Sequence, residues 1–326
     1  METISNKKHA PKQHLFQLNR TTQQIIFVLL LMSCAVFPII SPPVALLIGL
    51  IIANLFGHPF LHLNHKATSV LLQISVVGLG FGMNLHSAID AGKEGFLFTV
   101  VSIFSTLILG YFVGKWMGID KKISHLISCG TAICGGSAIA AIAPVVKSNE
   151  NQTSVGLGVI FILNSVALFL FPAIGHWLEL SQNDFGLWCA IAIHDTSSVV
   201  GAADKFGAEA LQVATTVKLA RALWIIPIAI GSSYIFKSGK SKVKIPYFIF
   251  LFILALVVNT YMPSVSTVAP YFVTIAKVGL TITLFLIGSG LNISKLKEVG
   301  VKPLLQGVLL WAFIASTSLF VIMKLS

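Results

Sequence analysis

Residues 128–144 read SCGTAICGGSAIAAIAP, and this stretch is the most informative part of the sequence for the fold. It lies within an apolar segment yet contains the adjacent pair Gly135 and Gly136, with the hydroxyls of Thr131 and Ser137 beside it. A membrane helix must satisfy its backbone internally, because lipid offers no hydrogen-bond partner. Adjacent glycines weaken such a helix, and the freed amides can face a bound ion or anion. We therefore expect a broken helix that lines a binding site near the membrane midplane, as in secondary transporters; close helix packing through small residues is the alternative.

The composition indicates a polytopic membrane protein. Of the 326 residues, 56% are hydrophobic and only 10% are charged, whereas a soluble domain carries roughly 25% charged residues. The formal net charge of +11 is explained by basic loops on one side of a membrane, so no nucleic-acid partner is expected. The four cysteines lie in apolar stretches without metal-ligand or disulfide spacing. Neither a metal nor a cofactor is expected.

Hydropathy predicts eleven membrane spans, since about twenty apolar residues cross a bilayer. The expected spans are residues 24–40, 43–57, 67–84, 95–117, 123–146, 154–174, 185–203, 212–236, 246–261, 270–291 and 304–323. They form one integral membrane domain over residues 24–326. A basic tail of residues 1–23 precedes them, and it is expected to lie in the cytoplasm without a cleaved signal peptide.

The distribution of basic residues predicts the orientation of the chain. With the N-terminus in the cytoplasm, fifteen of the 22 Lys and Arg residues fall in cytoplasmic loops, four fall in outside loops and three lie within spans. The four outside residues are Lys93, Lys147, Lys205 and Lys324. This positive-inside bias indicates a cytoplasmic N-terminus and a C-terminus on the outside.

Four charged residues inside the expected spans are candidates for function, because a charge at mid-membrane costs a few kcal/mol. The acid is Asp195, within the polar island His-Asp-Thr-Ser-Ser of residues 194–198, and the bases are Lys218, Arg221 and Lys277. Lys218 and Arg221 are three residues apart and share one helical face, where an ammonium and a guanidinium suit an oxyanion. The alternative is a structural ion pair between Asp195 and one base, which leaves one cation in excess.

The expected substrate site takes amides and hydroxyls from the Gly-rich stretch and the polar island, and its positive charge from two bases. Its residues are Thr131, Gly135, Gly136, Ser137, Thr196, Ser197, Ser198, Lys218 and Arg221. His194 and Asp195 are the expected locus of a coupling proton or Na⁺. Lys277 is a further candidate at that locus, where it would mimic a bound cation. Asn84, Asn164 and Asn292 are expected to hydrogen-bond to other helices.

Two internal likenesses suggest repeats. Residues 77–84 (VGLGFGMN) resemble residues 285–292 (FLIGSGLN), and their spans are antiparallel, as an inverted repeat requires. The second likeness joins spans five and six to spans seven and eight: a Gly/Ser/Thr-rich stretch precedes FPAIG at 171–175 and IPIAIG at 226–231. These latter pairs would be parallel, so the two likenesses do not fit one simple repeat.

The motifs at residues 129–144, 194–203, 217–221 and 285–292 resemble the YeiH-type sulfate exporter family of bacterial inner-membrane proteins. The resemblance covers nearly the whole chain, from about span two to the C-terminus. That family is grouped with the cation/proton antiporter and anion transporter superfamily. The resemblance implies an all-α fold of inverted five-helix repeats with broken, crossing helices and with scaffold and core parts. Spans two to six would then pair with spans seven to eleven.

These observations together predict a secondary transporter, with no enzymatic activity, for a small anion of the sulfate or sulfonate type. Export coupled to an H⁺ or Na⁺ gradient is expected. The transporter would act as a monomer or as a homodimer. One alternative is a cation/proton antiporter in which Asp195 carries the cation and Lys277 competes with it. The other is a membrane channel or sensor subunit without coupled transport. The sequence contains no nucleotide-binding or zinc-protease motif that would favour a pump or a protease.

Overall fold

The computed structural model describes residues 19–37, 40–236, 247–290 and 299–325, and all regular secondary structure within them is helical. Among these described residues, five helical stretches are long and apolar enough to cross a membrane. Three shorter apolar helices accompany them: α1 (Arg20–Val36), α2 (Pro42–Phe56) and α12 (Phe248–Tyr261). The predicted all-α, polytopic class is confirmed. The count of eleven crossings and the orientation stay predictions. Many of the basic residues behind the orientation, in 1–18, 237–246 and 291–298, lie outside the described residues, as does the end of the 285–292 motif.

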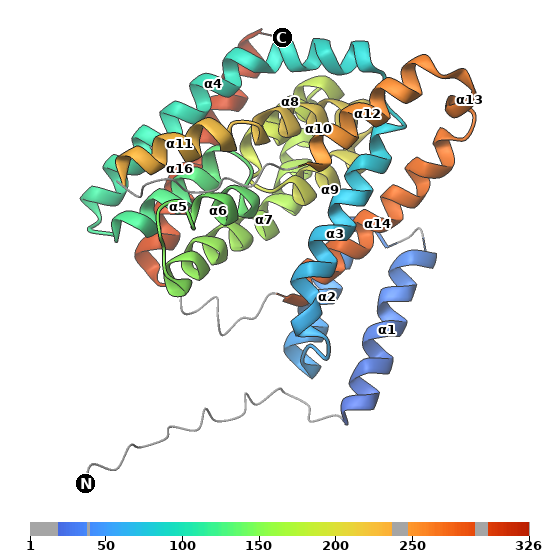
Figure 1. The fold of residues 1–326 in the computed structure, drawn as a ribbon, viewed down its shortest axis with the longest axis horizontal. Helices are drawn as coiled ribbons and strands as arrows, with labels where there is room; N and C mark the ends of the chain where they lie inside the picture. The colour runs from blue at the N-terminus through green and yellow to red at the C-terminus, as the bar shows by residue number, and fades with distance from the viewer. Residues whose placement is uncertain (1–18, 38–39, 237–246, 291–298, 326) are drawn as a thin grey trace.

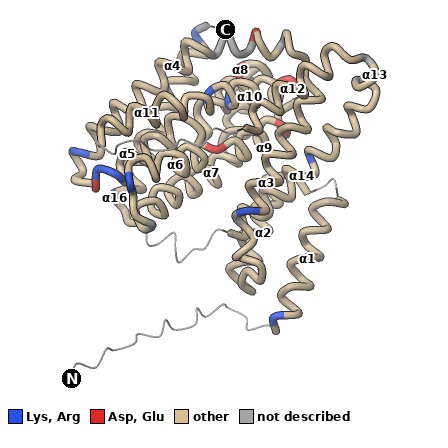
Figure 2. Tube along the Cα trace, in the orientation of Figure 1, with Lys and Arg blue, Asp and Glu red and all other residues tan. Residues whose placement is uncertain are grey.

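The helices form two groups (Figure 1). In the first, here called the α14 group, α1, α2 and α3 (Leu61–Gly80) pack on α14 (Ala269–Gly290), α12 packs on α3, and the short α13 (Pro263–Ser266) contacts α12 and α14. The second, here called the crossing group, contains α4 (Leu85–Trp116), α5 (Lys121–Ala132), α6 (Gly136–Ile142), α7 (Glu150–Trp177), α8 (Gln182–Ala192), α9 (Thr196–Phe206), α10 (Ala208–Ala222), α11 (Ile225–Ile235) and α16 (Val301–Leu325). Charged residues are sparse along both groups (Figure 2).

Small residues let α2 and α14 approach each other closely. A Cβ added at Gly49 would collide with the backbone of Phe285, and one added at Gly288 would collide with the backbone of Leu46. Such contacts are the usual way in which membrane helices pack tightly. The Gly288 of the 285–292 motif therefore serves helix packing, and α14 is continuous through it.

The break predicted in span five is confirmed. Helix α5 ends at Ala132 and α6 begins at Gly136. Between them Gly135 has φ +65°, and its N–H donates to the carbonyl of Gly130 at 2.8 Å, so the i to i−4 ladder is interrupted. Span seven is divided in the same way, because α8 ends at Ala192 and α9 begins at Thr196.

The positions of the breaks differ from those that a five-helix inversion would give. Such an inversion pairs span five with span ten, yet α14 runs unbroken from Ala269 to Gly290 and the second break lies in span seven. The breaks instead follow the second likeness, in which each divided span precedes a proline-containing helix. Those prolines are Pro172 in α7 and Pro227 in α11.

Two of the expected spans were shorter than the helices that the structure shows. Helix α4 begins at Leu85, ten residues before the expected start. Helix α9 continues to Phe206, so Asp204 lies in its last turn. The interpretation of Asp195 as the one acid among these helices is therefore wrong. The local cause is that Asp204 follows an apolar run, at the point where hydropathy indicates the end of a span.

Candidate functional site

The two helix breaks meet in the middle of the crossing group. A Cβ added at Gly135 would lie 3.2 Å from the N and Cα of Asp195 and from the carbonyl carbon of His194. The backbone of the first break thus packs directly on the backbone of the second. Gly135 also has φ +65°, a conformation that residues with a Cβ rarely adopt. Close approach and backbone conformation both require glycine here.

Lys218 caps the C-terminal end of α8. The last carbonyls of a helix have no partner within it and carry the negative end of its dipole. The Lys218 ammonium, which is fully buried, donates to the carbonyls of Ala190 at 3.2 Å and Ile193 at 2.6 Å. The indole N–H of Trp311, from α16, donates to the carbonyl of Ala192 at 3.1 Å. Side chains of α10 and α16 therefore satisfy three carbonyls at this helix end.

Arg221 caps the C-terminal end of α5 in a similar way. Its Nη2 donates to the carbonyl of Ala132 at 2.5 Å, and its Nη1 donates to the hydroxyl of Ser102, on α4, at 2.8 Å. The guanidinium is fully buried. Neither Arg221 nor Lys218 lies within ion-pair distance of the Asp195 carboxylate. The two bases instead stabilise the C-terminal ends of two different half-helices.

Asp195 caps the N-terminal end of α9. Its Oδ2 accepts hydrogen bonds from the backbone N–H of Ser197 at 3.1 Å and from the Ser197 hydroxyl, at the start of α9. A carboxylate is favourable there because the N-terminal end of a helix is positive. The N–H of Asp195 itself donates to Oδ1 of Asn164, on α7, at 3.2 Å. The predicted inter-helix bond of Asn164 is confirmed, and Ser197 is engaged by Asp195.

The point where the two breaks meet, here called the crossing, carries an excess of positive charge. Each of its three buried charges lies at the helix end that it stabilises. The partial charges of two C-terminal and two N-terminal helix ends, about half a charge each, cancel. Lys218 and Arg221 together therefore exceed an ionised Asp195 by one positive charge, and protonation of Asp195 would raise that excess to two.

Several buried polar atoms around the crossing make no hydrogen bond within the described protein. They are Oγ1 of Thr131, Nδ2 of Asn164, Nε of Arg221 and both ring nitrogens of His194. All four side chains are at most 3% exposed. Leaving such a group unpaired costs about 1–3 kcal/mol. Donors and acceptors are thus available to a small polar ligand at the point where the helices cross.

The other predicted site residues are divided between the crossing and its surroundings. Thr196 and Ser198 are buried in the first turn of α9. Gly136 is half-buried and faces Leu157 and Phe161 of α7, and Ser137 is exposed. The hydroxyl of Ser137 is therefore not among the buried groups of the crossing.

Lys277 lies away from the crossing. Its ammonium forms an ion pair with Asp204 at 2.5 Å, which joins α14 to the last turn of α9. Asp204 is nine residues beyond Asp195, roughly 14 Å along the helix at about 1.5 Å per residue. Three groups that contact these charges were not anticipated, namely Asp204, Ser102 and Trp311. Of these three, only Asp204 could have been identified from the sequence, because it is an acid at the edge of an apolar run.

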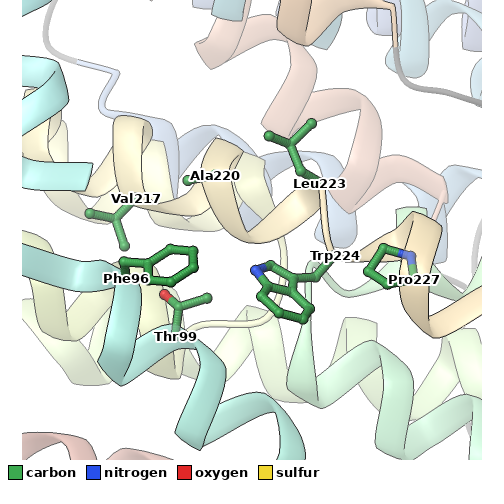
Figure 3. A pocket seen from close by; sticks show the side chains of 7 residues that line it. All are labelled: Phe96, Thr99, Val217, Ala220, Leu223, Trp224 and Pro227. Carbon is green, nitrogen blue, oxygen red and sulfur yellow. The ribbon is translucent and has the colours of Figure 1, made fainter. Parts of the chain in front are cut away.

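A cavity of about 290 Å³ lies beside α10 (Figure 3). It is lined by Phe96, Thr99, Val217, Ala220, Leu223, Trp224 and Pro227. None of these side chains is charged, so the cavity suits an apolar group. A second cavity, of about 520 Å³, includes Lys277, Asn259 and Thr274 in its lining. Neither cavity is lined by the charged residues of the crossing.

Comparison with known proteins shows close relatives along nearly the whole chain. Residues 22–307 match the family described as Conserved hypothetical protein 698. The chain is 57% identical, over 86% of each chain, to a UPF0324 membrane protein of Bacteroides thetaiotaomicron. It is 51% identical to one of Photobacterium profundum, covering 96% of this chain and 97% of that protein. A third, from Geobacter sulfurreducens, is 46% identical over 90% of this chain and 94% of its own length. No solved structure matches.

Proposed function

We propose that this chain, which belongs to the UPF0324 family of membrane proteins, is a secondary transporter of a small anion, coupled to an H⁺ or Na⁺ gradient. The observation that carries the proposal is the contact between two broken helices at Gly135 and Asp195. Half-helices that meet inside the membrane are the recurrent binding-site device of secondary transporters. Apposed half-helices also occur in some channels, so counterflow is the measurement that separates a carrier from a channel.

The charge of the crossing favours an anion as substrate. One positive charge is in excess there, and both bases retain unused donors. Lys218 uses two of the three donors of its ammonium, and Nε of Arg221 has no partner within the described protein. The resemblance to the YeiH-type sulfate exporters makes sulfate and small sulfonates the first substrates to test. An inner-membrane location with a cytoplasmic N-terminus follows from that resemblance and from the positive-inside bias.

Asp195 and His194 are the proposed coupling residues. Both are buried in the second break, and neither ring nitrogen of His194 is paired within the described protein. A proton on Asp195 would neutralise its carboxylate and strengthen anion binding, because it removes a repulsion between like charges that is strong in a low-dielectric interior. Binding of a proton and binding of an anion would thereby favour one another, as symport requires. With an inward H⁺ gradient this linkage drives import, in contrast to the export expected from the sequence.

The test is counterflow of labelled sulfate in proteoliposomes. A carrier exchanges external label for internal unlabelled substrate, a channel does not accumulate label, and an enzyme releases product. Arg221→Gln should weaken sulfate binding tenfold or more, equivalent to about 1.4 kcal/mol. Arg221→Lys should weaken it less, since the charge stays and only the planar fork is lost. Lys302→Gln, which neutralises an exposed cation on α16, is the matched control. Absence of counterflow with sulfate and small sulfonates would reject the proposal.

A further inference from the structure

The C-terminal end of α8 has the composition of a cation site. In secondary transporters, the carbonyls of half-helix C-terminal ends and of unwound backbone coordinate Na⁺. The carbonyls of Ala190 and Ile193 are of this kind, one in the last turn of α8 and the other in the break. Both accept hydrogen bonds from the buried ammonium of Lys218. An ammonium and Na⁺ carry the same charge and favour the same oxygen atoms.

We propose that Lys218 is a tethered cation that occupies the position of a coupling Na⁺, so that a Na⁺ gradient does not drive this protein. The absence of Na⁺-driven transport rests on the proposed transport function, whereas the occupation of the two carbonyls by Lys218 does not. A cation that is covalently attached cannot be released with the substrate, so this position is permanently filled.

The other carbonyls at the C-terminal ends of α5 and α8 support the same conclusion. The carbonyl of Ala132, at the C-terminal end of α5, is taken by Arg221. The carbonyl of Ala192, between the two that bind Lys218, is taken by Trp311. At both C-terminal ends that meet at the crossing, these carbonyls are thus taken by side chains from α10 and α16. Among the described residues, no pair of these carbonyls is left free for an ion.

The first measurement is the thermal unfolding of the wild-type protein in sodium chloride and in choline chloride at equal ionic strength. We expect the same Tm in both salts. In Lys218→Ala the two carbonyls lose their cation, and Na⁺ should then raise Tm by about 2–4 °C in a saturable manner, with choline giving no rise. Lys218→Gln serves as a second variant that retains a hydrogen-bond donor. Lys302→Ala, which removes an exposed cation on α16, should remain indifferent to Na⁺.

The outcomes distinguish a failure of this inference from a failure of the proposed function. A Na⁺-specific rise in the wild-type Tm, or sulfate transport driven by a Na⁺ gradient, would overturn the role of Lys218 and leave anion transport standing. Absence of a Na⁺ response in folded Lys218→Ala, or in Lys218→Gln where only that variant folds, would overturn it too. If neither variant folds, the wild-type comparison decides alone: equal values in the two salts support the inference. Absent counterflow together with a gain of Na⁺ response in Lys218→Ala would reject transport but keep the tethered cation.

Discussion

Gly135→Ala tests the contact between the two breaks. The new methyl group would lie 3.2 Å from backbone atoms of His194 and Asp195, which cannot rotate away as a side chain can. Residues in sparsely populated backbone regions cost about 1–3 kcal/mol, and overpacking a tight contact costs about 1–3 kcal/mol more. We therefore expect a loss of roughly 2–6 kcal/mol in stability. All four cysteines are buried, so a thiol-reactive fluorophore would report unfolding.

Two other glycines separate the contributions to this loss. Gly118 also has φ +65°, but an added Cβ there would meet no atom within 4 Å. Gly118→Ala should therefore show the cost of a positive φ without a contact, about 1–2 kcal/mol. Gly135 also has ψ −128°, outside the left-handed helical region, so its own conformational cost is no smaller. Gly136→Ala adds a methyl group at an ordinary contact of 3.5 Å from Leu157 and should be nearly neutral. Equal losses for Gly135→Ala and Gly118→Ala would refute the close approach of the two breaks.

Four further predictions concern orientation, coupling and inter-helix contacts. A C-terminal alkaline phosphatase fusion should be active and a C-terminal fluorescent protein dark; the reverse would contradict the odd number of spans. Asp195→Asn should retain Tm, because Asn caps a helix as well as Asp does, while transport loses its response to a pH gradient; an unchanged response would exclude Asp195 as the coupling residue. Lys277→Ala should cost under about 1 kcal/mol, because its ion pair with Asp204 is partly exposed, and exchanging the two residues should restore Tm. Trp311→Phe should lower stability by roughly 1–3 kcal/mol, as it leaves the carbonyl of Ala192 unpaired; an unchanged Tm would argue against this bond.

The class of the protein and one of the two breaks that meet at the crossing were predictable from local sequence. Hydropathy depends only on composition within a window, so the membrane helices were predictable. Gly135 and Gly136 weaken a helix wherever they stand, and their hydroxyl-bearing neighbours indicated that the helix opens there. The buried charges at 195, 218 and 221 were also identifiable, because ionisable residues are rare in apolar segments.

The contacts of those charges could not be predicted from local sequence. Arg221 lies 89 residues from Ala132, and Asp195 lies 31 residues from Asn164, so these partners follow from helix packing alone. The spacing of Lys218 and Arg221 placed them on one face but could not show that each caps a different half-helix. Hydropathy falls at a charge, so Asp204 was predicted to lie outside a span. In the structure α9 continues past Asp204, which forms an ion pair with Lys277. A local pattern can identify a polar group inside a membrane, but its partner depends on which helices the packing of the chain brings together.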